Sequence, residues 1–285
     1  MKKIFTLILI FLSSITMLAD VSITEKEALI KIYNATNGNQ WKTKWDLNAP
    51  VATWYGIKIK GNNVVALDLT FNNLNGELPQ EIGDLVYLQK LKLTRNAISG
   101  NIPNSIGNLK SLVLLNISFN KLTGKIPDSI TDLKELQTLE LFMNKLSGEL
   151  PFEIGKLKQL KKLSLYNNEL MGSIPASLYE MKSLRVLLLN SNKLSGKLDK
   201  KIANLSQLVT FSLFDNNIQG EIPLDLEKLK KLKEMNISYN LFSGFVSKDL
   251  AKLDTLNMMM FNNEGVAVVL QVKEVNKNSA LASGE

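Results

Sequence analysis

The sequence of 285 residues contains neither cysteine nor histidine. Without cysteine there are no disulfides and no thiol-linked lipid anchor. Without histidine the chain lacks the usual general base and zinc ligand, and with them any Ser-His-Asp or Cys-His arrangement. These two absences exclude more chemistry than any motif of the chain suggests. We therefore expect no metal site and no cofactor.

Long apolar runs are also scarce, and the one at the start is a targeting signal. Residues 1–19 carry two lysines, an apolar stretch from Ile4 to Leu12 and small residues up to Ala19. This pattern is typical of a secretory signal peptide and is too short to span a bilayer. No later stretch of the sequence is long and apolar enough to do so. We expect cleavage after Ala19 and an exported protein, secreted or at the cell surface.

Proline is rare, yet six of the seven prolines recur within one repeated pattern. The pattern has a period of 24 residues without insertion, and its marker is an asparagine followed four residues later by glycine. The eight marker residues are Asn72, Asn96, Asn120, Asn144, Asn168, Asn192, Asn216 and Asn240.

Each recurring position has a structural reason. Leu91 and Leu93 alternate with polar residues, as in a strand with one buried face. Asn96 follows that strand, where a buried asparagine can bond to the backbone of its own turn and of the next. Gly100 suits a tight bend, and Pro103 begins the return path. One such coil cannot bury its leucines alone, whereas a stack of coils can.

The pattern resembles the plant-type leucine-rich repeat, in stretches such as LQTLELFMNKLSGELPFEIGKLKQL from Leu136 to Leu160. The resemblance implies an α/β solenoid: a right-handed coil with a parallel concave sheet, helical or 3-10 turns on the convex side and a helical N-terminal cap. We expect a signal peptide at 1–19, the cap at 20–63 and eight repeats at 64–255. A degenerate ninth repeat, a C-terminal cap and a loose tail are expected at 256–285.

The expected N-terminal cap combines a helix with an aromatic cluster. Residues 23–36 predict a helix that begins with a capping box of Thr24 and Glu27. All three tryptophans follow, at Trp41, Trp45 and Trp54. Plant relatives usually hold cysteine pairs in this cap, so aromatic packing must serve here instead. A sugar site is the less favoured interpretation of these aromatic residues.

Function is expected on the concave face, because the repeat leaves the outward strand positions free. The two residues before each marker asparagine should face solvent, although many are large and apolar. We predict a ligand-binding stripe there; its residues are Phe71, Arg95, Phe119, Phe142, Met143, Tyr166, Phe214, Asp215 and Tyr239. The alternative is that these aromatic side chains only cover neighbouring strands.

The charge pattern and the glycosylation triplets leave further questions open. Lysines crowd the second half of the chain, mostly in the expected helical turns. A solvated convex face is the favoured interpretation, and contact with an anionic polysaccharide or membrane is the alternative. N-x-S/T triplets begin at Asn34, Asn116, Asn204 and Asn236 and matter only if the producing cell glycosylates.

The resemblance implies a recognition module, because relatives include receptor ectodomains and polygalacturonase-inhibiting proteins. We expect a monomer that binds a protein, a peptide or an extracellular glycan, not nucleic acid, with an inhibitory or adhesive role. One alternative is a structural or adhesive fragment of a larger surface protein. A glycan-acting enzyme is a remote alternative, because the outward carboxylates Asp68, Glu140 and Asp215 lie three repeats apart and glycosidases need a close pair. We therefore expect no catalytic residues.

Overall fold

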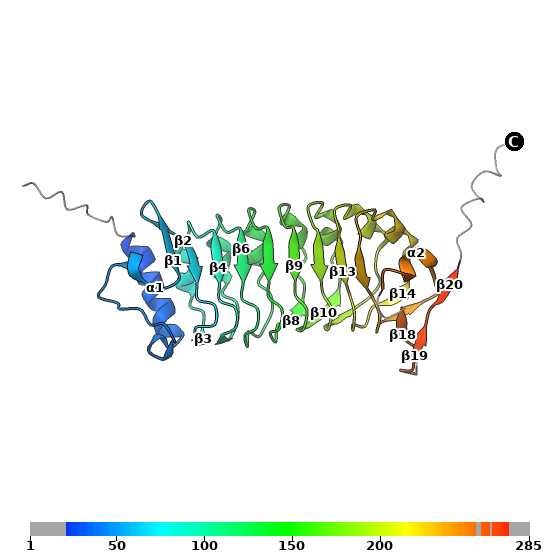
Figure 1. Cartoon of the computed structure of the whole chain (residues 1–285), viewed down its shortest axis with the longest axis horizontal. Coiled ribbons are helices and arrows are strands. Elements are labelled where there is room, and N and C mark those ends of the chain that lie inside the picture. Colours follow the sequence, from blue (N-terminus) through cyan, green and yellow to red (C-terminus); the bar gives the residue numbers. More distant parts are fainter. Residues whose placement is uncertain (1–20, 255–257, 263, 274–285) are drawn as a thin grey trace, which may run out of the picture.

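The computed structural model describes residues 21–254, 258–262 and 264–273, and these form one elongated coil (Figure 1). The signal peptide expected at 1–19, the start of the ninth repeat at Leu256 and the tail expected from Asn276 lie outside the described residues.

The main sheet has nine strands side by side along the coil (Figure 1). Strand β1 pairs antiparallel with β2, and every later pair is parallel, with residues 24 apart in register, such as Leu91 with Leu115. The strands are β1 (Ile57–Lys60), β2 (Asn63–Asp68), β4 (Lys90–Lys92), β6 (Leu114–Asn116), β7 (Thr138–Glu140), β9 (Lys162–Ser164), β11 (Val186–Leu188), β13 (Thr210–Ser212) and β15 (Glu234–Asn236). Stacking buries one leucine column completely, as the alternation predicted.

A second set of short strands, which the sequence pattern did not predict, follows seven of the eight marker asparagines; Asn120 is the exception, and two such strands follow Asn240. Gly100, just beyond β5, has a φ of 70°, and an added Cβ would lie 2.6 Å from the Glu77 side chain. Glycine is therefore needed at this bend for both conformation and space. These strands are β3 (Asn75–Glu77), β5 (Ala97–Ser99), β8 (Ser147–Glu149), β10 (Glu169–Ser173), β12 (Lys193–Ser195), β14 (Gln219–Glu221), β16 (Leu241–Ser243) and β17 (Phe245–Ser247).

The return path of each coil contains a short 3-10 helix. Proline at the N-terminal boundary fixes φ, and the apolar residues of the turn, such as Ile106 and Leu109, are buried. The Ser129 hydroxyl donates to the Asn104 carbonyl at 2.7 Å, which ties neighbouring coils together. The 3-10 helices are η1 (Gly38–Gln40), η2 (Val51–Thr53), η3 (Gln80–Asp84), η4 (Asn104–Asn108), η5 (Asp128–Asp132), η6 (Ile154–Lys156), η7 (Ala176–Glu180), η8 (Lys200–Asn204) and η9 (Leu224–Lys228).

The first coil is covered by helix α1 (Ile23–Ala35) and the three tryptophans. The predicted capping box of Thr24 and Glu27 is wrong by two residues. Ser22 is the N-cap and accepts a hydrogen bond from the Glu25 amide at 3.2 Å. Glu25 is buried, and its carboxylate accepts a hydrogen bond from the Val64 amide of β2 at 3.0 Å. The box therefore also joins the helix to the sheet.

Two neighbouring coils replace recurring positions of the repeat, one its glycine and the next its proline, and the two replacements contact each other. Tyr179 occupies the position that is glycine in several other coils, and it is buried. Asp199 stands in the proline position of the next coil, and its amide lies 3.4 Å from the Tyr179 hydroxyl. Proline has no amide hydrogen to donate. Asp199 therefore supplies a hydrogen bond that proline could not.

The C-terminal end differs from the repeats. Helix α2 (Lys248–Ala251) takes the place of a 3-10 turn, and Asp254 bridges to β15. A closing strand was expected over Val266–Val275; the structure has two short ones, β19 (Ala267–Val269) and β20 (Gln271–Lys273). Strand β19 pairs with β18 (Met259–Phe261), and β20 pairs with β17.

Candidate recognition surface

The marker asparagines hold the turns at the C-terminal ends of the main strands. The Asn120 side-chain amide donates to the carbonyl oxygens of Leu93 and Ile117 at 2.9 and 3.2 Å, and its oxygen accepts from the Ile98 amide at 2.9 Å. Asn96, Asn144, Asn168, Asn192, Asn216 and Asn240 repeat this arrangement. Asn72 instead bonds to the backbone of Thr43.

Burial of the asparagine column is less uniform than expected. Asn72, Asn168, Asn216 and Asn240 are buried, whereas Asn96, Asn120, Asn144 and Asn192 are half-buried. The hydrogen bonds to backbone are nevertheless the same in the half-buried members. The asparagine side chains therefore hold the backbone of the turns whether they are buried or partly exposed to solvent.

The residue before each marker asparagine adopts a left-handed backbone conformation, which the sequence pattern did not reveal. In all eight coils φ at this position lies between 51° and 57°; the residues are Phe71, Arg95, Phe119, Met143, Asn167, Ser191, Asp215 and Tyr239. This conformation costs a non-glycine residue roughly 1–2 kcal/mol. Because it recurs in every coil, it is a property of the asparagine turn and not of one special site.

Two aromatic ladders run across neighbouring strands on this surface. Phe142 stacks on Tyr166 with ring centroids 4.4 Å apart and planes 13° apart, and Phe119 meets Phe142 edge to face at 5.2 Å. We call these three residues the first ladder. The second ladder joins Phe214 to Tyr239 at 5.2 Å and Tyr239 to Phe261 at 5.3 Å. Phe261 was missed because it lies beyond the last marker asparagine.

The candidate residues differ in how freely they reach solvent. Phe71 is 63 % exposed and lies under the Lys42 ammonium, which is 3.0 Å from the ring centroid. Arg95, Met143 and Asp215 are exposed, whereas the first-ladder rings, Phe214 and Tyr239 are half-buried. The aromatic rings therefore both pack on one another and present part of their surface outward.

Not every position before an asparagine faces solvent as expected. Ser118 and Ser238 are fully buried, because their hydroxyls turn to neighbouring polar groups. Ser118 donates to the Asn116 side chain at 2.6 Å, and Ser238 donates to Asp254 at 3.0 Å. These two residues belong to the scaffold.

A shallow pocket adjoins the first ladder. Phe119, Asn120, Met143, Asn144 and Asn167 line a space of about 440 Å³. Asn167 donates to the Met143 sulfur at 2.7 Å, which fixes one side of the opening. Because the Asn120 and Asn144 side chains bond to backbone and Asn167 bonds to Met143, the apolar surface of Phe119 and Met143 is what the pocket offers a ligand.

Polar side chains on β6, β7 and β9 adjoin the first ladder. Glu140 accepts from Asn116 at 2.7 Å and pairs with Lys162. Burial, together with the Glu140 carboxylate, raises the pKa of Tyr166. The hydroxyl of Ser164, between Glu140 and Leu188 in strand register, is buried without a partner.

Two of the three outward carboxylates, Asp68 and Glu140, are held in ion pairs. Burial alone would raise the pKa of Asp68, but hydrogen bonds from Thr70 and the Lys92 ammonium at 3.4 Å lower it below its ordinary value. Glu140 is engaged with Lys162 as described. Among the described residues, no group of three His, Cys, Asp or Glu side chains is placed to hold a metal ion.

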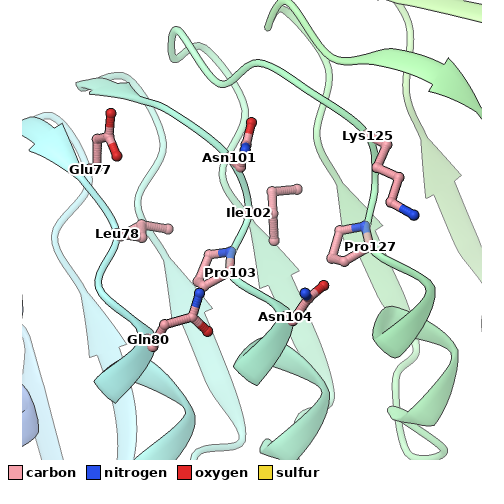
Figure 2. Close-up of a pocket in the computed structure, with 9 residues that line it drawn as sticks. All are labelled: Glu77, Leu78, Gln80, Asn101, Ile102, Pro103, Asn104, Lys125 and Pro127. Carbon is pink, nitrogen blue, oxygen red and sulfur yellow. The ribbon is translucent and has the colours of Figure 1, made fainter.

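A further pocket of about 320 Å³ lies on the flank, between the second strands and the 3-10 helices (Figure 2). Pro103 and Pro127 lie in its middle, with Glu77 and Lys125 toward one border and Asn104 toward the other (Figure 2). None of the predicted binding residues lines this pocket.

The stacked coils, each with a parallel strand, an asparagine turn and a 3-10 turn, define a leucine-rich-repeat solenoid. The family models "Leucine-rich repeat region" and "Leucine Rich Repeat" match residues 66–147 and 159–181. The BIR2 ectodomain of Arabidopsis thaliana is 30% identical over 56% of this chain and 86% of its own, with a TM-score of 0.50. This chain belongs to the leucine-rich-repeat proteins of the plant type.

Two other relatives are matched over less than a third of their own length. The ectodomain of the Arabidopsis thaliana receptor kinase GASSHO1/SCHENGEN3, in complex with CASPARIAN STRIP INTEGRITY FACTOR 2, has 27% identity and a TM-score of 0.76, with 88% of this chain and 30% of that chain covered. Polygalacturonase inhibitor 1 of Arabidopsis thaliana is 33% identical over 71 residues, 24% of this chain and 22% of that protein. The matched regions therefore cover 30% of the ectodomain chain and 22% of the inhibitor. Among the described residues no helix is long and apolar enough to cross a membrane.

Proposed function

We propose that this protein is an exported recognition module, without catalytic activity, that binds a protein, peptide or glycan through its concave face. The observation that carries the proposal is the first ladder. Three neighbouring coils place aromatic rings, rather than small polar residues, on the concave surface, outside the hydrophobic core. The adjoining pocket adds a hollow that Phe119 and Met143 line. Rigid, partly exposed aromatic rings beside a pocket are typical of binding hot spots.

The relatives support the same proposal. The receptor ectodomain named above was solved with a bound factor, and the inhibitor is named for the enzyme that it inhibits. Export is supported by the targeting signal at the start of the sequence. The absence of catalysis is supported by the ion pairs that occupy Asp68 and Glu140.

A matched pair of variants tests the site. The double variant Phe142→Ala/Tyr166→Ala removes the stacked rings, whereas Phe152→Ala removes a ring that is 78 % exposed on the flank. Both are compared with the wild-type protein on a glycan array and in a pull-down from extracellular material. We expect the double variant to lose a partner that wild type and Phe152→Ala both retain.

Two outcomes would overturn the proposal. Equal retention of every partner by the double variant would remove the first ladder from the site. Equal loss by Phe152→Ala would show that the captured molecules adhere to any exposed ring. Circular dichroism of each variant establishes that it is folded before binding is compared.

A further inference from the structure

A row of cations lies along the edge where the 3-10 turns lead into the main strands. One coil position holds lysine in four successive coils, at Lys110, Lys134, Lys158 and Lys182, and the position three residues later holds Lys161 and Arg185 in the last two of them. Lys110 is paired with Asp132, and the other five cations form the row. All five side chains are exposed. We call these five residues the basic rim.

Backbone contacts place the members of the rim on adjacent coils. The Arg185 amide donates to the Lys161 carbonyl at 2.8 Å. Lys158 and Lys182 follow η6 and η7, which contact each other, and occupy the same place in their coils. Parallel strands lie about 4.8 Å apart, so the rim repeats its cations at that interval along the coil.

Few carboxylates compensate this charge. Glu180 pairs with Lys158 at 3.0 Å, and Glu135 is the exposed acid next to Lys134 in the sequence. Lys161 donates to the uncharged Gln137 side chain at 2.9 Å. Lys182 and Arg185 have no ion pair among the described residues. Five cations thus face two carboxylates.

Nearby acids outside the rim are already paired. Asp132 binds Lys110 at 3.3 Å, and Glu153 binds Lys156. These pairs leave the excess positive charge concentrated on the rim. A concentrated field of one sign attracts an oppositely charged ligand and raises its local concentration.

The shape of the rim selects among anionic ligands. A straight row of equally spaced cations on a rigid scaffold fits a linear polymer with one anionic group per monomer. A membrane-binding surface combines cations with apolar side chains that enter the lipid. The residues beside the rim, Gln159 and Ser183, are polar, so this second component is missing.

We propose that the basic rim binds a linear anionic polysaccharide, laid along the long axis of the coil. The rim lies before the N-terminal ends of β9 and β11, whereas the aromatic ladders lie at the C-terminal ends of the main strands. The rim is therefore separate from the proposed concave site. The first-ladder variant Phe142→Ala/Tyr166→Ala retains polysaccharide binding if the two sites are independent.

The test measures affinity of the full chain for alginate, a polyuronate, and heparin, a polysulfate, with neutral dextran as a blank. Lys182→Gln/Arg185→Gln removes two rim cations. Lys31→Gln/Lys44→Gln removes the same charge from exposed residues at the N-terminal end. At roughly 50 mM salt, where screening is weak, we expect the rim variant to bind at least one polymer about 10- to 30-fold more weakly.

The control variant is expected to bind within about twofold of wild type, and added salt should weaken wild-type binding most. An equal loss in both variants would show attraction by net charge alone. Absence of binding to both polymers, or stronger binding to phosphatidylglycerol vesicles than to either, would also overturn the proposal. A rim variant that melts at the same temperature as wild type shows that its weaker binding is not caused by unfolding.

Discussion

At the N-terminal end the first coil is covered by aromatic rings, whereas at the C-terminal end the last main strand is held by a carboxylate. Trp45 lies between Trp41 and Trp54, with ring centroids 4.9 and 4.8 Å away, and all three rings are buried. Asp254 accepts hydrogen bonds from the Ile237 amide at 2.8 Å and from the Ser238 hydroxyl at 3.0 Å.

The two ends also differ in what they leave exposed. Each tryptophan donates its indole N–H to a backbone carbonyl, so the N-terminal cluster has no unsatisfied polar atom at its rings. At the other end Val266, Val269 and Val272 are more than half exposed. A solenoid end must be covered. This chain covers one end with a cluster of aromatic rings, and the other with short strands whose Met258, Met260 and Leu270 are buried beside the Asp254 contacts.

The largest effect is expected at the N-terminal end, from Trp45→Ala. Removing a buried tryptophan leaves a cavity between its ring neighbours and should lower the free energy of unfolding by about 3–5 kcal/mol. Urea unfolding followed by circular dichroism measures this change. A loss below about 1 kcal/mol would show that the aromatic cluster does not stabilise this end.

A smaller effect is expected at the C-terminal end, from Asp254→Ala. The variant leaves the Ile237 amide and the Ser238 hydroxyl without this acceptor, at roughly 1–2 kcal/mol for each stranded group. Unfolding in urea should therefore shift by about 2–4 kcal/mol. Val272→Ser, on an exposed side chain, is the control and should stay within about 0.5 kcal/mol. Equal losses in both variants would contradict the role of Asp254.

Between the two ends, the titration of Tyr179 is expected to lower the stability of the fold at alkaline pH. Burial raises the pKa of Tyr179 to about 12; the hydrogen bond from the Asp199 amide opposes this rise, and the Asp199 carboxylate adds to it. The folded chain holds this proton more tightly than the unfolded chain, whose tyrosine has a pKa near 10. The protonated Tyr179 thus contributes roughly 2 kcal/mol to the free energy of unfolding below about pH 10. This contribution is lost as the pH rises to about 12.

Tyr179→Phe removes the titrating hydroxyl and should flatten this part of the stability profile. Tyr87→Phe, at an exposed position, is the control and should leave the profile as in wild type. Urea midpoints at pH 9, 10 and 11 compare the three proteins. Parallel profiles for all three would mean that Tyr179 does not set the alkaline limit.

The sequence predicted the coil because the repeat is strict: leucine alternation, asparagine and proline each have one structural role. Local side-chain and backbone geometry was harder to predict from the sequence. The capping box of Ser22 and Glu25 was missed because Thr24 and Glu27 have the same spacing. The left-handed residue before each asparagine was also missed, because phenylalanine, arginine and serine at that position carry no common signal.

The candidate site was predicted only in outline. Ser118 and Ser238 fall in the same column as Phe142, so position in the repeat could not tell a buried hydroxyl from an outward ring. Their burial depends on nearby polar partners, Asn116 and Asp254, which a single sequence does not place. Phe261 joins the second ladder from beyond the last repeat, where no period guided the prediction.

The most direct test of the separation between scaffold and binding surface compares Asn120→Ala with Phe119→Ala. Asn120→Ala strands backbone groups of neighbouring coils and should lower the free energy of unfolding by about 1–3 kcal/mol. Phe119→Ala should cost about 1 kcal/mol or less, as for cross-strand contacts, yet weaken binding of a captured partner by about 2 kcal/mol. The measurement is urea unfolding and partner affinity on both variants. If Phe119→Ala unfolds the protein as strongly as Asn120→Ala, or leaves affinity unchanged, the aromatic surface is part of the scaffold and the account is contradicted.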